Sequence, residues 1–191
     1  MNKQIKTLWR SGGMFLAAVI LLTGLFILIN YQRGSAQASG LNPVIGRGRP
    51  IVLHGQVLGG GHLSTAQWKG KVVVVDFWGT WCPWCVKEAP YIAKLYSRYH
   101  RHGLEVVGVA LDDTATAVHH YRQEHPKENW PQIFDQHPGN GAIAQKLGIS
   151  GLPTEFIIDR GGILRYIVVG YAPNRIAADV RKLLAKGTAS Q

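Results

Sequence analysis

The sequence predicts an α/β fold, a three-layer sandwich around a central mixed sheet, preceded by an N-terminal transmembrane helix. Short β-branched runs alternate with stretches of helical spacing between residues 72 and 147, which is the order of a parallel sheet flanked by helices. Two more strand-like runs follow around a glycine turn, and an apolar run stands alone near the N-terminus. The 191 residues leave room for one domain with a sizeable core and a short appendage.

The N-terminal apolar run covers residues 14–29 and lies inside a longer uncharged stretch. About 20 apolar residues cross a bilayer, so we expect an anchor at residues 12–32. Basic residues precede this anchor and only Arg33 follows it closely. This asymmetry predicts a cytoplasmic segment at residues 1–11 and a C-terminal part on the other side of the membrane.

A cleaved signal peptide is the alternative to an anchor, since Ala36-Gln37-Ala38 resembles a cleavage site. The apolar run is longer than the usual core of such a peptide, which favours an uncleaved anchor. In a bacterium, either case predicts an inner-membrane or secreted protein whose C-terminal domain lies in the periplasm. We expect a glycine-rich linker at residues 33–49, the folded domain at residues 50–187 and a tail at residues 188–191.

The first elements of the domain surround one apolar strand. Residues 51–58 alternate weakly between apolar and polar side chains and are expected to pair as a hairpin with residues 62–63. Residues 72–77 are short and β-branched, which is typical of a buried central strand. Apolar residues keep helical spacing from residue 83 to about residue 101 and stop before a glycine, so we expect a helix there.

The second half of the domain continues the alternation. A buried strand is expected at residues 104–111, followed by a helix that ends near residue 124 and is capped within Asp112-Asp113-Thr114. The remaining elements are an extended piece at 130–134, a brief helix at 142–147, an antiparallel strand pair at 155–158 and 163–169, and a last helix from a cap at Asn174 to residue 186.

The distribution of charge argues against a nucleic-acid function. The formal net charge is +10, but the four basic residues of residues 1–39 are accompanied by no acid and account for four of these charges. The basic residues of the folded domain are spread out and form no run. Mild attraction to anionic lipid or acidic partners is therefore all that the charge predicts.

Both cysteines of the chain lie in one tetrapeptide, Cys82-Pro83-Trp84-Cys85, directly after the strand at residues 72–77. A C-x-x-C pair where a strand passes into a helix is the layout of a dithiol redox centre. The free N–H groups and the positive dipole end of a first helical turn lower the pKa of a thiol placed there. We therefore expect Cys82 to attack as a thiolate and Cys85, one turn deeper, to resolve the mixed disulfide.

Three other interpretations of the pair are a structural disulfide, part of a metal site and two inert core cysteines. A disulfide across two intervening residues closes too short a loop to stabilise the fold much. A structural metal site needs about four ligands, and the sequence has no second C-x-x-C and no H-x-x-x-H. We therefore expect neither a metal nor a cofactor. Trp81 and Trp84, on either side of a proline, indicate an exposed rim.

The sequence around the cysteines resembles the thioredoxin superfamily, and within it the membrane-anchored TlpA/ResA-like thiol–disulfide oxidoreductases. The matching pieces are, in order, Asp76–Pro90, Gly151–Asp159 and Gly161–Leu164. The resemblance covers roughly residues 50–187 and implies a thioredoxin-like sandwich. One departure is that proteins of this group commonly place proline directly before the second cysteine, whereas here it follows the first.

The resemblance implies roles for further residues. Pro153 matches the cis-proline that faces the dithiol and helps to bind an extended substrate chain, an ordinary trans proline being the alternative. Asp76 matches the buried proton acceptor beneath the resolving cysteine, unless it bonds to a loop at the strand end. Glu88 matches an active-site glutamate three residues after Cys85, unless it is a solvated surface side chain. Pro90 matches the proline that kinks the active-site helix.

These features predict an extracytoplasmic oxidoreductase that exchanges disulfides with protein substrates and is recharged by a membrane redox partner. The resemblance favours the reductive direction, in cytochrome c maturation or in reduction of other thiol proteins. The alternatives are a disulfide oxidase or isomerase of the same fold, and a non-catalytic tethered binding or metal-handling module. The expected catalytic residues are Cys82, Cys85, Pro153, Asp76 and Glu88, and the expected substrate contacts are Trp81, Pro83, Trp84, Leu152 and Thr154.

Overall fold

A computed structural model describes residues 45–112, 114–135 and 142–186 of the chain. The predicted cytoplasmic segment, the anchor, most of the linker and the tail lie outside these residues. Within the described ranges, no helix is long and apolar enough to span a bilayer.

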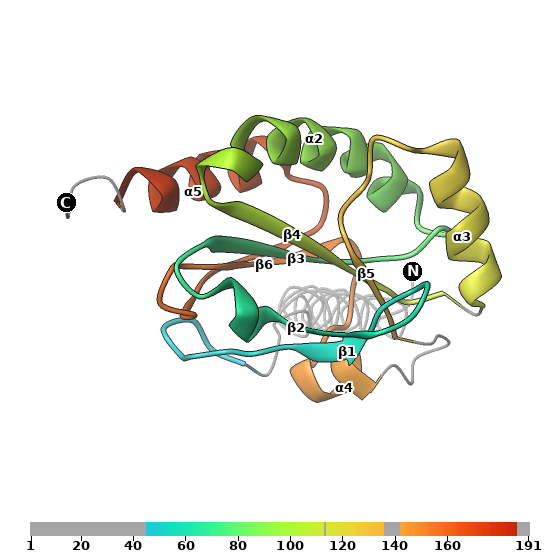
Figure 1. Ribbon diagram of the computed structural model, residues 1–191, viewed down its shortest axis with the longest axis horizontal. Coiled ribbons are helices and arrows are strands. Elements are labelled where there is room, and N and C mark those ends of the chain that lie inside the picture. The colour runs from blue at the N-terminus through green and yellow to red at the C-terminus, as the bar shows by residue number, and fades with distance from the viewer. Residues whose placement is uncertain (1–44, 113, 136–141, 187–191) are drawn as a thin grey trace, which may run out of the picture. The chain divides into compact units, whose positions relative to one another are not determined.

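The folded part is built on a five-stranded sheet with the strand order β5-β4-β3-β6-β7 (Figure 1). β3 is parallel to β4 and β4 is parallel to β5, whereas β6 runs antiparallel to both β3 and β7. The predicted mixed central sheet is therefore confirmed. The strands span Val72–Trp78 (β3), Leu104–Ala110 (β4), Gln132–Phe134 (β5), Thr154–Ile158 (β6) and Leu164–Val169 (β7).

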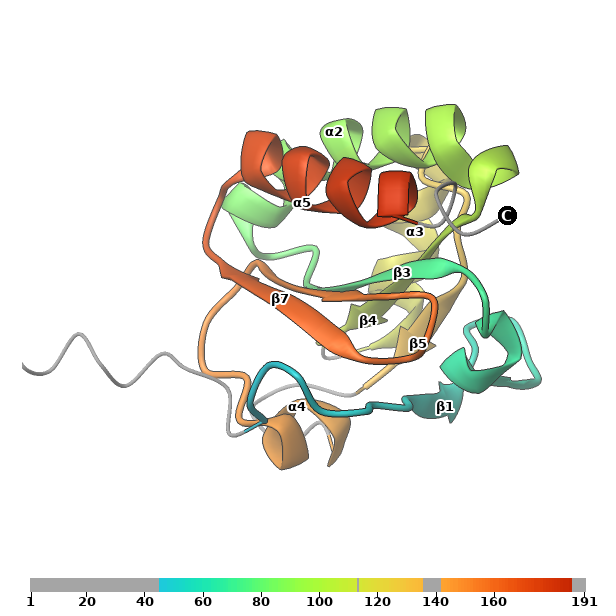
Figure 2. The ribbon, with the colours of Figure 1, turned by 90° about the vertical axis from the view of Figure 1, so that its left-hand side faces the viewer.

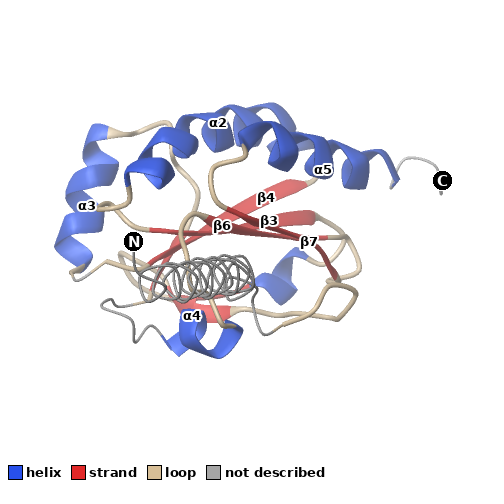
Figure 3. Ribbon diagram, turned by 180° about the vertical axis from the view of Figure 1, so that it is seen from behind, coloured by secondary structure: helices blue, strands red, loops and turns tan. Residues whose placement is uncertain are grey.

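Further elements lie on both faces of this sheet (Figures 2 and 3). The helices α2, α3 and α5 are on one side, and the helix α4 with the antiparallel hairpin β1-β2 is on the other. The predicted three-layer arrangement is thus present. These elements span Pro83–Tyr99 (α2), Ala115–Glu124 (α3), Pro173–Lys186 (α5), Ala142–Leu147 (α4), His54–Gln56 (β1) and His62–Ser64 (β2), with short 3₁₀ turns at Thr65–Trp68 (η2) and His100–His102 (η3).

β3 is buried on both faces, and its alternation aims one acid at the helices. Its odd-numbered residues within 73–77 pack into the core that also holds Leu53 and Leu63 of the hairpin side. Val74 faces the other core, under α2 and α5. Because alternate residues of a strand share a face, Asp76 lies on this second side, between Val74 and Trp78.

Two predicted strands are shorter than expected. Only residues 54–56 of the stretch 51–58 pair with the second hairpin strand, although Leu53 outside the pairing is buried in the core. β5 pairs with β4 through residues 132–134, whereas Trp130 is buried without belonging to a strand. In both places the apolar residue is buried as the sequence pattern indicates. A residue can be buried without being paired in a strand, so the pattern overestimates the strand length.

The cap of α5 differs from the expectation, whereas the cap of α3 lies within the predicted Asp112-Asp113-Thr114. α5 begins at Pro173, which suits the first helical position, so Asn174 lies inside its first turn. Thr114 caps α3 by accepting a hydrogen bond from the N–H of Ala117 at 3.2 Å. The carboxylate of Asp112 accepts a hydrogen bond from the N–H of Thr80, in the loop before the cysteines.

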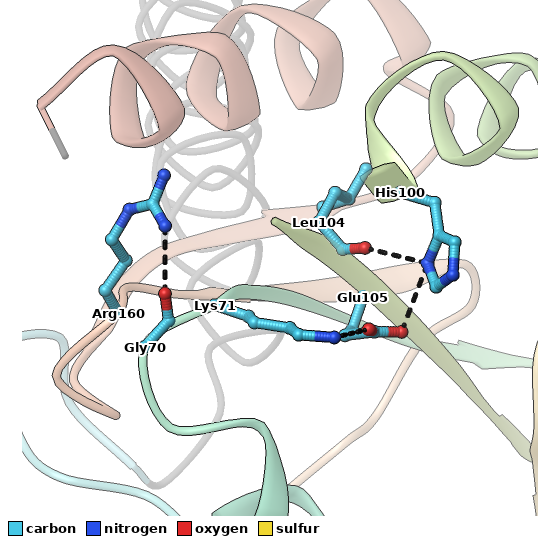
Figure 4. Close-up of polar contacts among 6 residues, drawn as sticks. All are labelled: Gly70, Lys71, His100, Leu104, Glu105 and Arg160. Carbon is cyan, nitrogen blue, oxygen red and sulfur yellow. Dashed lines mark hydrogen bonds and ion pairs between the residues drawn. The ribbon is translucent and has the colours of Figure 1, made fainter. Parts of the chain in front are cut away.

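Glu105 is a buried carboxylate at the end of the sheet opposite to the cysteines. Figure 4 shows it beside Lys71 and His100. Its Oε1 accepts a hydrogen bond from Lys71 Nζ, and its Oε2 lies 3.4 Å from His100 Nδ1. Arg160 donates to the carbonyl of Gly70 at 2.9 Å in the same region. Both carboxylate oxygens of Glu105 therefore have polar partners.

We expect Glu105→Gln to lower the free energy of unfolding by about 1–2 kcal/mol, because a charge-assisted hydrogen bond to a half-exposed lysine is worth about that much. Urea unfolding measures the change. The reaction rate of the cysteines should stay at the wild-type value, since Glu105 lies at the far end of the sheet. An unchanged unfolding free energy would contradict a stabilising role for this contact.

Candidate active site

The cysteines lie where β3 passes into α2. After Trp78 the chain turns, and the N–H of Cys82 donates to the carbonyl of Gly79 at 3.1 Å. Cys82 is the N-cap of α2, with its Sγ accepting a hydrogen bond from the N–H of Cys85 at 3.2 Å, and Pro83 takes the first helical position. Cys82 and Cys85 form a disulfide. The predicted strand-to-helix placement of the pair is confirmed.

The surroundings of Cys82 favour a thiolate in the reduced state. The N–H that donates to its sulfur belongs to the first turn of α2, whose positive dipole end stabilises negative charge. Both cysteines are nearly buried, with 4% of Cys82 and 3% of Cys85 exposed, whereas the adjacent Trp81 and Trp84 are about half exposed. The predicted aromatic rim is therefore present beside the disulfide.

The loop between β3 and α2 is held by Asp112, which follows β4. Its carboxylate accepts hydrogen bonds from both the N–H and the hydroxyl of Thr80. The indole N–H of Trp81 donates to the carbonyl of Leu111 at 3.1 Å. These contacts fix the turn from which Cys82 begins the helix.

A groove of about 650 Å³ opens beside the disulfide. Among the described residues its lining includes no charged side chain, so the groove suits a peptide segment that is apolar around its cysteine. Its far wall comes from α4 and the loop that follows, including Ile149. The expected substrate contacts that line it are Trp81, Pro83, Trp84 and Leu152.

The loop before β6 carries the predicted cis-proline. The Leu152–Pro153 peptide bond is cis. The carbonyl of Pro153 accepts a hydrogen bond from Gly170 N–H at 2.8 Å, and the hydroxyl of Thr154 donates to the carbonyl of Gly151 at 2.8 Å. Pro153 and Thr154 are buried and do not line the groove. Their contact with a substrate stays a prediction.

Buried acids lie between α2 and the sheet. Glu88 is 1% exposed, and its Oε1 accepts a hydrogen bond from Ala172 N–H at 2.8 Å, so the interpretation of Glu88 as a solvated surface residue is wrong. Burial raises the pKa of Asp76 well above its ordinary value, and the charges of Glu88 and Glu128 raise it further. Asp76 and Glu88 therefore both lie inside the protein on the side of the cysteine helix.

Trp84 is held at the rim by a second aromatic residue. The rings of Trp84 and Tyr171 have centroids 5.6 Å apart, and Lys87 Nζ lies 4.8 Å from the first centroid and 5.0 Å from the second. Tyr91 meets Tyr171 edge to face at 6.4 Å. Aromatic and cation–π contacts of this kind restrict the orientation of the indole beside the disulfide.

The sequence interpretation missed Glu155, Asp112 as a loop anchor, and Tyr171. Glu155 is fully buried within the apolar strand β6. Like Asp76, Glu155 is an acid within an apolar strand, so this pattern in the sequence could have identified it. Tyr171 carries no such signal, because its meeting with Trp84 depends on how α5 returns to α2.

The profile of the Redoxin family matches residues 50–185 of the chain. The thiol-disulfide oxidoreductase ResA of Bacillus subtilis (strain 168) is 31% identical over 131 residues, which cover 69% of this chain and 71% of that protein. ResA of Bacillus thuringiensis subsp. konkukian is 36% identical over 105 residues, 55% of this chain. The match spans 58% of the length of that second relative, less than two thirds.

Solved structures share the fold. A putative thiol:disulfide interchange protein DsbE from Chlorobium tepidum superposes with a TM-score of 0.64 at 24% identity, over 75% of this chain and 98% of that one. The thioredoxin domain of a thiol-disulfide oxidoreductase from Bacteroides vulgatus has a TM-score of 0.62 at 27% identity, over 73% of this chain and 99% of that one. The sandwich around β3 is therefore a thioredoxin fold.

Proposed function

Because the chain belongs to the Redoxin family, in the TlpA/ResA-like group of the thioredoxin superfamily, we propose that it is a thiol–disulfide oxidoreductase acting on protein substrates. The observation that carries this proposal is the disulfide between Cys82 and Cys85 at the start of α2, beside a groove lined by no charged side chain of the described residues. A binding module needs no such pair at the mouth of its groove.

The reaction follows from the positions of the two sulfurs. In the reduced protein the Cys82 thiolate attacks a substrate disulfide, forming one S–S bond to the substrate and releasing its other sulfur as a thiolate. Cys85 then loses its proton and attacks the Cys82 sulfur. The disulfide of this chain forms as the mixed disulfide breaks, and the substrate leaves with two thiols. Two electrons pass from the dithiol to the substrate, and the reverse sequence installs a disulfide.

We propose the reductive direction, with maturation of cytochrome c or reduction of another thiol protein as the task. The support is similarity to proteins named ResA. The same similarity and the N-terminal apolar run support an extracytoplasmic domain that is anchored in the membrane and recharged by a membrane redox partner. Disulfide chemistry outside the cytoplasm fits this location.

The reduction potential of the Cys82–Cys85 couple tests the direction. We expect a value near that of thioredoxin, about −270 mV, because the uncharged Trp84 before the second cysteine adds no positive partner for the thiolate. Equilibration of the full 191-residue chain with a thiol buffer, followed by tryptophan fluorescence, measures it. The half-exposed Trp81 and Trp84 beside the pair should report its state.

A disulfide oxidase or isomerase is the second candidate, favoured by the order Pro83-Trp84, which departs from the group's usual placement of proline. A potential of about −120 to −180 mV would establish this candidate and overturn the reductive direction. In that case the dithiol form would be the stabilised one, and the partner would be an electron acceptor.

A further inference from the structure

Glu155 is an ionisable side chain in the middle of the central sheet. It is 0% exposed and lies in β6, all five residues of which are buried. Among the described residues, neither of its carboxylate oxygens has a hydrogen-bond donor. A buried carboxylate without a donor is costly, so a carboxyl in such a place has to be neutral or has to share a proton.

Glu155 lies on the same side of the sheet as Asp76. The two residues are directly opposed in the antiparallel pairing of β3 with β6. Val74, two residues before Asp76, and Ile157, two residues after Glu155, are paired with each other and belong to the core under α2 and α5. Since residues two apart in a strand share a face, the carboxyls of Asp76 and Glu155 both face α2.

Glu88 reaches the same space from α2. It lies three residues after Cys85 and is 1% exposed. Its Oε1 is occupied by the N–H of Ala172, whereas its Oε2, like both oxygens of Glu155, has no donor among the described residues. Ionised carboxylates only accept hydrogen bonds, so a proton held between Glu88 and Glu155 is what would give these atoms a partner.

The charges around the pair favour this proton. Burial raises the pKa of Glu155 most, then the closeness of the Glu88 carboxyl, then the negative charges of Asp76 and Glu88, while the backbone N–H of Glu155 itself lowers it by less. On the side of α3, the negative charge of Glu128 raises the pKa of Asp76, and the negative charge of Asp76 raises the pKa of Tyr121. The cationic groups near these elements, Arg122 and His125, act on Glu128.

We propose that Glu155 is a positioning residue for the dithiol reaction, which holds one proton jointly with Glu88 and thereby limits the negative charge beneath Cys85. This inference rests on the proposed function. When Cys85 resolves a mixed disulfide, its proton passes to the acid cluster or to solvent. A cluster that is already fully ionised would oppose the Cys85 thiolate by like-charge repulsion, whereas the shared proton keeps one charge neutralised.

The first test is infrared spectroscopy of the oxidised full chain with glutamate isotope-labelled at the side-chain carboxyl. At neutral pH we expect a labelled carbonyl band of a protonated carboxyl in the wild type, and its loss in Glu155→Gln and in Glu88→Gln. In either variant the amide donates to the remaining carboxylate, which then stays ionised. A wild-type spectrum without the band would overturn the proposal.

The second test is the pH dependence of the rate at which glutathione disulfide oxidises the reduced chain. In Glu155→Gln the pair of residues 88 and 155 can carry only one negative charge. We therefore expect the pH at which the oxidation rate is half-maximal to fall by about one unit, which is the coupling typical of interacting carboxyls. Glu155→Asp, which keeps an acid, should return the profile toward that of the wild type. An unshifted profile in Glu155→Gln would overturn the proposal.

Glu105→Gln is the matched control, since Glu105 is also a buried glutamate of a central strand but has Lys71 and His100 as partners. It should lose stability without shifting the pH profile. The first test needs no substrate and the second uses a small disulfide, so both remain decisive if the chain fails to reduce a protein such as insulin. That failure would overturn the proposed function, and the band and the profile would still decide the role of Glu155.

Discussion

The Cys82→Ser variant should lose insulin-reducing activity by more than about a thousandfold, the scale seen when an enzyme loses its attacking nucleophile. A serine hydroxyl is not ionised at neutral pH. The hydrogen bond from Cys85 N–H cannot make it as good a nucleophile as the thiolate. Turbidity of the reduced insulin chains measures the rate. The unfolding free energy of the reduced forms should be close to the wild-type value, because serine also caps a helix well.

Cys85→Ser separates the two sulfurs. It keeps the attacking thiolate and removes the resolving thiol, so we expect it to accumulate a covalent complex with its substrate that excess reductant releases. Non-reducing electrophoresis detects that complex. If Cys82→Ser formed the complex and Cys85→Ser did not, the two roles would be reversed. Full activity in Cys82→Ser with intact folding would instead leave the disulfide without a catalytic part.

Local signals in the sequence were sufficient for the fold and for the position of the cysteines. The β-branched run of β3, the helical spacing after Pro83 and the glycines between elements each act over a few residues. For this reason the sheet and its covering helices could be assigned without long-range information. The pair Cys82 and Cys85 needs only one helical turn to come together, and the structure joins them as a disulfide.

Features that depend on distant parts of the chain were out of reach. The sequence allowed Glu88 to be a solvated residue, and its burial depends on the chain just before α5, where Ala172 N–H donates to its carboxylate. The opposition of Asp76 and Glu155 depends on the register of β6, in which a shift by one residue would turn Glu155 to the other face. Long-range tertiary contacts, rather than local secondary-structure propensity, bring these acids together under α2.

We expect the oxidised protein to become less stable as the pH rises above about 4, the ordinary range of carboxyl groups. Burial, and then the charges of Glu88 and Glu128, raise the pKa of Asp76 in the folded state, so the native protein binds this proton more tightly than the unfolded chain does. The stabilisation is complete below the unfolded pKa and is lost as the pH rises toward the folded pKa. Between these two pKa values the free energy of unfolding falls by about 1.4 kcal/mol per pH unit for each proton that the native state binds in excess.

Asp76→Asn tests this linkage, since it removes the titrating group and keeps the shape of the side chain. In this variant the unfolding free energy should depend less steeply on pH, by the contribution of about one proton. At neutral pH its unfolding free energy should be higher than that of the wild type. Urea unfolding across a pH series measures both quantities, with Glu105→Gln as a control that keeps the wild-type slope. Glu155, whose pKa is also raised by burial, is expected to account for the slope that remains. A wild-type stability that stayed level or rose across this range would mean that Asp76 is ionised in the folded protein as readily as in the unfolded chain, and such a group would be too weak a base to accept the proton of Cys85.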